Sequence, residues 1–332
     1  MIKVAMLSGW HVHAKGYARQ ANSIPGVEVA AIWDEEPSRG EAWAEELGVP
    51  FYADLDELLA VDDIDGVIVD TPTNMHREVI VKAAKAGKHI FTEKVLALTV
   101  EDCEAIAEAV KEAGVKFAIS YPHQVMPRMI FAKQVLDSGV LGQVTLLRIR
   151  NAHNGASAGW LPPHFYDPVA CGGGALMDLG AHGMYLTRWL LGMPESVNAA
   201  LTFVTGKEVE DNAVTFMKYE DGCIAIQETG FVSSQSPFSL EIYGTEGSLL
   251  IQGPNQTITF ATNSSGEGGI SGWIVPSRLP QPGVSPMEQW IEGIRNDAPI
   301  DFGVEDGIAL TQLMVAAYQA HETGTWVKLA DL

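Results

Sequence analysis

Short apolar runs alternate with amphipathic segments over the first 120 residues of the chain. The apolar runs, which are typical of buried strands, are Ile2–Ser8, Val27–Trp33, Gly66–Asp70, His89–Thr92 and Val115–Ser120. The segments between them have helical character: Val12–Ser23, Pro37–Leu47, Asp54–Ala60, Met75–Ala86 and Thr99–Ala113. Gly48 and Gly114 directly follow two of these helices, as is common at helix C-termini. Strands that alternate with helices of this length form βαβ units, which predicts a parallel sheet with helices on both faces.

The pattern changes after Tyr121-Pro122, where strands begin to follow one another. These predicted strands are Val144–Arg150, Val197–Thr205, Val214–Tyr219, Cys223–Phe231, Phe238–Tyr243, Ser248–Gln252 and Thr257–Ala261. Tight turns such as Asp221-Gly222 between them predict antiparallel pairing. Helices are predicted over Phe131–Ser138, Met177–Leu191, Pro286–Asn296 and Val304–Glu322, and Asn151–Gly174 is predicted to be loop-rich. The predicted fold class is therefore α/β: a parallel-sheet domain over residues 1–120, then an α+β domain with a large, mostly antiparallel sheet over residues 121–332.

Composition narrows the class of protein. With 332 residues and 47% hydrophobic residues, the chain is long enough for two cores. Its net charge of −21 disfavours nucleic acid and anionic membranes as partners. The three cysteines form no CxxC motif, so neither a disulfide framework nor a thiolate zinc site is expected. The apolar start is too short for a signal peptide, and no run is long enough to span a membrane, so we expect a cytoplasmic protein.

The turn after the first strand is the first candidate ligand site. In a Rossmann domain this turn is rich in glycine and leads into a helix whose N-terminus holds the pyrophosphate of a dinucleotide. Here it reads Ser8-Gly9-Trp10-His11-Val12, with only one fingerprint glycine, so an ordinary turn is an equal interpretation. Asp34 ends the second strand at the spacing of a carboxylate that binds the adenosine ribose, or else caps the next helix. That carboxylate favours NAD over NADP, although Arg39 keeps NADP open.

A second candidate segment is Thr71-Pro72-Thr73-Asn74-Met75-His76, at the carboxyl end of the strand Gly66–Asp70. Ligands of open α/β sheets bind along that edge, so Thr71, Pro72, Asn74 and His76 are candidate cofactor-binding residues. Asn74 has the alternative role of capping the helix that follows.

Three motifs together resemble the Gfo/Idh/MocA oxidoreductases, the family of glucose–fructose oxidoreductase and the inositol dehydrogenases. They are the segment Thr71–His76, Ala86-Gly87-Lys88-His89-Ile90-Phe91-Thr92-Glu93-Lys94, and Gly172-Gly173-Gly174-Ala175-Leu176-Met177-Asp178-Leu179-Gly180-Ala181-His182. The resemblance implies an NAD(H)-dependent enzyme that transfers a hydride to or from a carbinol of a sugar, inositol or glycoside. It implies that Glu93 and Lys94 lie at the nicotinamide end and that Asp178 and His182 belong to the catalytic centre. This chain departs from the family pattern at Val95, where proline is usual, and at Tyr185, where aspartate is common.

Oxidation of a carbinol requires a base, and we expect His182 to fill this role because its ordinary pKa lies near neutrality. Asp178, four residues earlier, is expected on the same helix face, to orient His182 or to bind a substrate hydroxyl. Lys94 is expected to stabilise the developing alkoxide. These roles require Lys94 and His182 to converge beside the nicotinamide.

Aromatic and histidine side chains are candidates for substrate binding, because they suit the C–H faces and hydroxyls of sugars. We expect His123, Trp160, His164 and Tyr166 to contribute. Histidines are dense in this sequence, which also admits a metal site, but their spacing matches no standard metal motif and none is expected.

Three other functions stay open at this point. One is a lyase or glycosidase that retains NAD and uses transient oxidation. Another is a non-catalytic, dinucleotide-dependent sensor. The third, and least favoured, is a metal-dependent hydrolase. Helices are expected to cover only one face of the large sheet, and an exposed apolar face is unfavourable. We therefore expect the other face to be buried against another subunit, in a homodimer or homotetramer.

Overall fold

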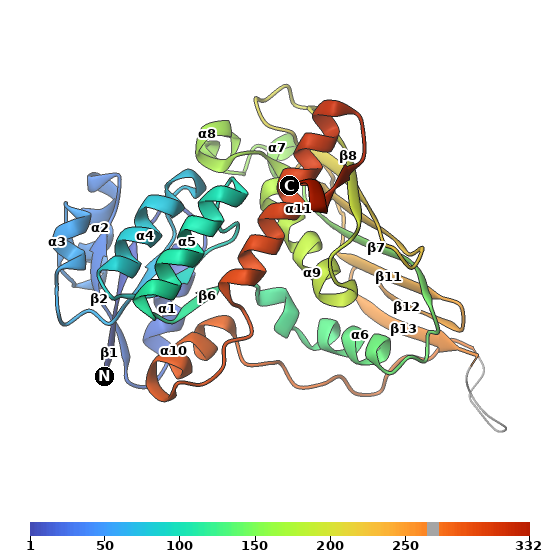
Figure 1. The fold of residues 1–332 in the computed structure, drawn as a ribbon, viewed down its shortest axis with the longest axis horizontal. Helices are drawn as coiled ribbons and strands as arrows, with labels where there is room; N and C mark the ends of the chain where they lie inside the picture. Colours follow the sequence, from blue (N-terminus) through green and yellow to red (C-terminus); the bar gives the residue numbers. More distant parts are fainter. Residues whose placement is uncertain (264–271) are drawn as a thin grey trace. The chain divides into compact units, whose positions relative to one another are not determined.

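The computed structural model describes residues 1–263 and 272–332, which form two compact units (Figure 1). The first unit consists of Met1–Ser120 and Val284–Thr311, and the second of Tyr121–Gly283 and Gln312–Leu332. None of the helices within the described ranges combines the length and the apolar character that crossing a membrane requires.

The first unit contains a six-stranded parallel sheet in the order β3-β2-β1-β4-β5-β6. Its strands are β1 (Ile2–Leu7), β2 (Val27–Trp33), β3 (Phe51–Tyr52), β4 (Gly66–Val69), β5 (His89–Thr92) and β6 (Phe117–Ile119). Its helices include α1 (Ala14–Ser23), α2 (Pro37–Leu47), α3 (Leu55–Leu59), α4 (His76–Lys85) and α5 (Val100–Ala113). This confirms the predicted parallel α/β sheet, to which the structure adds the short β3.

Local sequence signals set the ends of these helices. The Asp54 carboxylate accepts hydrogen bonds from two backbone N–H groups at the start of α3, and the Thr99 hydroxyl accepts one, from Asp102 N–H, at the start of α5. Gly48 and Gly114 adopt left-handed conformations after α2 and α5, which glycine adopts without steric cost.

Helix α10 (Pro286–Asn296) belongs to the first unit, whereas the predicted division placed all residues after 120 in the second domain. Its Trp290 side chain is fully buried and lies against Phe91 of β5, with ring centroids 5.8 Å apart. Burial of an aromatic side chain of this size stabilises the packing by about 2–3 kcal/mol. The division therefore differs from the expected one at Val284–Thr311, because a distant amphipathic helix completes the first core.

The second unit contains an eight-stranded sheet in the order β13-β12-β11-β7-β10-β9-β8-β14. Its strands are β7 (Val144–Ala152), β8 (Ser196–Thr202), β9 (Asn212–Lys218), β10 (Ile224–Gly230), β11 (Ser239–Gly244), β12 (Gly247–Gln252), β13 (Thr257–Thr262) and β14 (Val327–Lys328). Strand β7 lies between β10 and β11 and pairs with β10 in parallel. The tight turn at Asp221-Gly222 joins β9 to β10 as an antiparallel pair, and the predicted, mostly antiparallel character of the sheet is confirmed.

Helices cover one face of this sheet (Figure 1). They include α6 (Pro127–Asp137), α9 (Ala181–Leu191) and, from Gln312 onward, α11 (Val304–Thr323). Met217, Ala225 and Leu147 are fully buried on this face, while their neighbours along each strand point the other way. The alternation of burial along β9 and β10 is what the period of two predicts for a sheet with one covered face.

Two predicted helix boundaries were wrong in this unit. Helix α6 begins at Pro127, because proline suits the first turn of a helix. The segment predicted to be loop-rich, Asn151–Gly174, includes two short helices, α7 (Gly155–Ala158) and α8 (Pro168–Cys171). The predicted helix over Met177–Leu191 is α-helical only from Ala181, and Leu176–Gly180 before it forms a single π-helical turn. Single π-helical turns are rare in proteins, and those that occur often lie at functional sites.

Candidate active site

The turn Ser8-Gly9-Trp10-His11 lies at the carboxyl edge of the first sheet and is tied to two strand ends. Ser8 N–H donates to the carbonyl of Trp33 at the end of β2 (2.7 Å), and His11 N–H donates to the carbonyl of Asp70 just after β4 (3.2 Å). Ser8 has a φ of 80°, a left-handed conformation that is uncommon for a residue other than glycine. This edge is where open parallel sheets bind their ligands.

Asp34 organises the same turn. One of its carboxylate oxygens accepts from Gly9 N–H (2.8 Å), and Arg39 donates to both oxygens, from Nε at 2.9 Å and Nη2 at 2.6 Å. The alternative that Asp34 caps α2 was wrong, since the N-cap residue is Glu36. Arg39 also reaches Ser8 Oγ (3.4 Å), so a guanidinium group stands beside the turn. A Cβ added to Gly9 would lie 3.2 Å from the Trp43 ring, so the backbone passes close to its neighbours here.

The loop after β4 contains buried polar atoms. Both carboxylate oxygens of Asp70 and Oγ1 of Thr71 are buried and form no hydrogen bond with any residue in the described part of the chain. Burial raises the pKa of Asp70 well above its ordinary value, and the nearby Glu93 carboxylate raises it further. Such atoms are costly inside a protein unless a polar group partners them. They fit a dinucleotide bound along this edge.

His76 holds this loop in place rather than pointing out of it. Its buried ring lies 3.2 Å from the carbonyl oxygen of Thr71 and 3.1 Å from that of Leu96. Pro72 and Thr73 are buried as well, and Asn74 is exposed. The alternative that Asn74 caps α4 was wrong, because the N-cap residue is Met75 and no side chain makes a capping bond there.

Glu93, directly after β5, is a buried carboxylate surrounded by donors. It accepts a hydrogen bond from the Tyr17 hydroxyl, and His13 Nδ1 lies 3.3 Å from its Oε2. Burial by itself raises the pKa of Glu93, but the charges of His11 and His13 outweigh it and hold the pKa well below its ordinary value. Lys94 Nζ, also buried, lies 3.9 Å from the other Glu93 oxygen. The cluster therefore places the Glu93 carboxylate beside the turn, with its negative charge offset by His11, His13 and Lys94.

His11, His13 and Glu93 also form a candidate metal site. One ligand atom from each lies within 4.8 Å of the other two. Two imidazoles and a carboxylate are a donor set that zinc or iron accepts. The expectation that the protein uses no metal stays a prediction, which a chelator test addresses below.

In the second unit, a glycine turn leads into the segment that carries Asp178 and His182. The buried Glu210 carboxylate accepts hydrogen bonds from Gly174 N–H (2.9 Å) and Leu176 N–H (2.8 Å), and from the Tyr318 hydroxyl (2.9 Å). A Cβ at Gly174 would lie 2.0 Å from the Glu210 carbonyl oxygen, so only glycine fits. Sequence analysis did not identify Glu210 or Tyr318, which fix the start of this segment.

His182 is buried near the start of α9 and contacts two further rings. Its Nδ1 lies 3.0 Å from the Tyr185 hydroxyl oxygen, which also accepts from His123 N–H at 3.3 Å. The His123 ring stacks on His182 with ring centroids 4.3 Å apart. The structure thus brings together two predicted site residues, His123 and His182, and adds Tyr185. The spacing of three residues on a helix was the available sequence signal for Tyr185.

The other predicted substrate residues lie in the segment between β7 and the glycine turn. Trp160 is half-exposed, packs on His153 with ring centroids 4.6 Å apart, and donates to Asn154 Oδ1 (3.2 Å). Asp178, which is half-buried, acts electrostatically on His153. Tyr166 lies beneath the Lys207 ammonium group, 4.1 Å from its ring centroid. His164 packs on Phe165, with ring centroids 4.7 Å apart.

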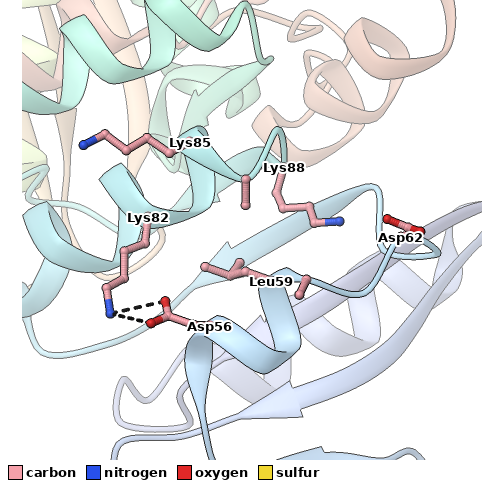
Figure 2. Close-up of a pocket in the computed structure, with 8 residues that line it drawn as sticks. Asp56, Leu59, Asp62, Lys82, Lys85 and Lys88 are labelled. Atoms are coloured by element: carbon pink, nitrogen blue, oxygen red, sulfur yellow. Dashed lines mark hydrogen bonds and ion pairs between the residues drawn. The ribbon is translucent and has the colours of Figure 1, made fainter.

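A cavity between α3 and α4 lies away from these residues (Figure 2). Lys82 pairs there with Asp56, and the Lys88 ammonium donates to the carbonyls of Val61 (2.7 Å) and Ile64 (2.8 Å). Because Lys88 directly precedes β5, this cavity lies at the amino edge of the sheet, opposite the ligand edge. Lys82 and Lys88 stabilise the domain itself.

Comparison with known proteins identifies the family. Residues 6–121 match the family described as "Oxidoreductase family, NAD-binding Rossmann fold", and residues 129–250 match "GFO/IDH/MocA C-terminal domain". The chain belongs to the Gfo/Idh/MocA family of oxidoreductases. It is therefore an NAD-binding oxidoreductase, as the sequence motifs implied.

Individual relatives of this Gfo/Idh/MocA protein span nearly its whole length. It is 30% identical to scyllo-inositol 2-dehydrogenase (NAD(+)) of Bacillus subtilis, over 96% of this chain and 93% of that protein. It is 29% identical to 1,5-anhydro-D-fructose reductase of Ensifer adhaerens, over 96% of both chains. The crystal structure of an NAD-binding protein from Listeria innocua shares the fold, with a TM-score of 0.86 and 22% identity over 98% of this chain and 96% of that one.

Proposed function

We propose that this Gfo/Idh/MocA protein is a dehydrogenase that transfers a hydride between NAD and a CH–OH group of a sugar, inositol or glycoside. The observation that carries the proposal is His182, a buried imidazole hydrogen bonded through Nδ1 to Tyr185 and positioned by a glycine turn. The two relatives are named for activities on an inositol and on an anhydro sugar, which supports this substrate class.

His182 is the proposed acid/base. If Nδ1–H donates to the Tyr185 oxygen, the lone pair of Nε2 is available to take a hydroxyl proton. The Tyr185 oxygen has two lone pairs, so it accepts from both His182 and His123 N–H. Asp178 is proposed to bind a neighbouring substrate hydroxyl or to orient His182, and His123, Trp160, His164 and Tyr166 to bind the substrate.

Lys94 is proposed to stabilise the alkoxide that forms as the proton leaves. Its ammonium group is buried, where a charge acts more strongly than in water, and Glu93 partly offsets that charge. The nicotinamide, when bound, supplies the hydride acceptor.

The proposed cofactor site lies along the carboxyl edge of the first sheet. Its residues are Ser8, Gly9, Trp10, His11, Val12, Asp34, Thr71, Pro72, Asn74, His76, Glu93 and Lys94. His11, next to the start of α1, would replace the missing glycines by a side-chain contact to the pyrophosphate. Asp34 favours NAD, while Arg39 would also accept a 2′-phosphate.

A substrate panel with matched variants tests the proposal. Sugars, polyols and glycosides are assayed with NAD and NADP by the absorbance of the reduced cofactor, using wild type, Lys94→Ala, His182→Asn and the exposed control Lys85→Ala. We expect Lys94→Ala and His182→Asn to lose at least a hundredfold in kcat while still binding NAD, and Lys85→Ala and addition of a chelator to have no effect.

Three results would contradict the proposal or its expectation that no metal is used. Product formation without net release of reduced cofactor would indicate the lyase or glycosidase chemistry with transient oxidation. Binding of NAD and sugars without turnover in wild type, together with unchanged binding in Lys94→Ala and His182→Asn, would indicate a sensor. Loss of activity on chelation would assign a metal to His11, His13 and Glu93.

A further inference from the structure

A small cavity in the second unit adjoins the His182 cluster. It encloses about 200 Å³. Its wall consists of His123, Met126, Arg128, Met129, Asn151, Phe238 and Gln256. Pockets that take a whole ligand usually measure roughly 300–1,000 Å³, so this volume suits one substituent of a larger ligand.

The cavity connects to the proposed acid/base through His123. The His123 ring forms part of the cavity wall and stacks on His182 at 4.3 Å between centroids. On its other side His123 meets the edge of Phe238, at 6.2 Å and an interplanar angle of 82°. A substrate whose hydroxyl reaches His182 would therefore extend a neighbouring group along His123 into the cavity.

Arg128 sets the charge of this cavity. Its Nε donates to the carbonyl of Gln256 (3.1 Å) and its Nη2 to the carbonyl of Asn255 (3.4 Å). These neutral partners hold the guanidinium in place without cancelling its charge, and within the described ranges no carboxylate pairs with it. Arg148 and Arg150, on the nearby β7, both pair with Glu228.

In a chain with a net charge of −21, Arg128 is held by two backbone carbonyls and keeps its positive charge at the cavity wall. An arginine that is fixed through some of its donors has an ordered guanidinium plane, and the rigid fork of its remaining donors matches carboxylate and phosphate oxygens. Met126, Met129 and Phe238 add apolar surface that strengthens such a contact by excluding water.

We propose that this cavity is a subsite for an acidic group, a carboxylate or a phosphate, on the substrate, with Arg128 as its cation. The inference rests on the proposed function, because it extends the site around His182. It narrows the substrate class from sugars and polyols in general to their acidic derivatives.

Paired ligands test the subsite by calorimetry on the NADH-bound protein. Each pair differs in one acidic group: D-glucuronate and D-glucose, D-gluconate and D-glucitol, and D-glucose 6-phosphate and D-glucose. In wild type we expect the acidic member of at least one pair to bind roughly ten- to a hundredfold more tightly than its neutral partner. Preference for the phosphate pair would identify a phosphate, and preference for the other two a carboxylate.

Variants locate that preference. Arg128→Gln should remove it, and Arg128→Lys should retain a part, because lysine keeps the charge but loses the planar fork. Arg278→Gln, at an exposed arginine of the same unit, should leave it unchanged. If Arg128→Gln does not fold, two other measurements test the subsite. They are the affinity of Arg128→Lys for the acidic ligands and the decrease of wild-type affinity for these ligands as the salt concentration rises.

The inference is overturned if no acidic ligand exceeds its neutral partner, or if Arg128→Gln keeps the preference. Failure of the proposed function gives a different result: Lys94→Ala and His182→Asn would leave turnover unchanged, while Arg128-dependent binding of acidic ligands persisted. The two proposals can thus fail separately.

Discussion

The Tyr185 hydroxyl oxygen lies 3.0 Å from Nδ1 of His182, one turn earlier on α9. The family pattern commonly has an aspartate where Tyr185 stands. A neutral phenol fixes the orientation of the imidazole but stabilises its protonated form less than a carboxylate would. At this position the surroundings of His182, the proposed acid/base, differ from the usual family pattern.

Tyr185→Phe should therefore impair catalysis without unfolding the protein. Loss of one hydrogen bond of roughly 1–2 kcal/mol corresponds to a five- to thirtyfold lower kcat. We also expect the pH profile of kcat to shift, since His182 loses its partner. Steady-state kinetics across pH measure both effects, and Tyr243→Phe, on β11, serves as control. An unchanged pH profile would show that Tyr185 has only a packing role.

Glu210→Gln should loosen the segment that carries Asp178 and His182. The amide offers one acceptor oxygen where the carboxylate accepts from Gly174, Leu176 and Tyr318, so a buried donor is left unsatisfied at a cost of about 1–3 kcal/mol. Urea unfolding measures the loss, and kcat should fall with it. Glu208→Gln, at an exposed position on the same loop, is the control. Equal stability of Glu210→Gln and wild type would refute this role.

Asp70→Asn should stabilise the NAD-free protein increasingly as pH rises. The pKa of Asp70 is raised in the folded state, so its contribution to stability is full below the pKa of the unfolded chain and is lost as pH rises through the folded pKa. Asparagine does not ionise and avoids that loss. Thermal unfolding between about pH 4 and 8 compares the two proteins, with the exposed Asp62→Asn as control. If the difference in Tm between the two proteins does not grow with pH, the raised pKa assigned to the buried Asp70 carboxyl is wrong.

His11→Ala and His13→Ala should weaken NAD binding, because each removes a charge that offsets Glu93 beside the turn. We expect a roughly five- to thirtyfold higher Kd, corresponding to about 1–2 kcal/mol. The effect should shrink in a Glu93→Gln background, since the charge to be offset is then absent. Fluorescence titration measures Kd, with Lys15→Ala on the exposed side of α1 as control. Equal Kd values in all variants would mean that backbone groups alone hold the cofactor.

Phe216→Glu should weaken self-association through the large sheet. Phe216 pairs across β9 and β10 with Ile226, and it is 37% exposed on the face away from the helices. Such an apolar pair in water favours burial against a second copy of the chain. Sedimentation velocity at several protein concentrations compares the variant with wild type. A wild-type protein that sediments as a monomer would refute the expected homodimer or homotetramer.

The sequence by itself determined the elements and their order in the first sheet, because alternation of apolar runs, helix caps such as Thr99 and left-handed glycines such as Gly48 act within a few residues. It also identified the motifs of the family around Lys94 and His182. The tertiary structure decided that α10 returns to the first core through Trp290, and that β7 separates β10 from β11. It also decided that the His123 ring stacks on His182 and that His123 shares a cavity wall with Arg128 and Phe238. These relationships join residues distant in the chain, and they depend on which apolar surfaces pack together, which no local pattern encodes.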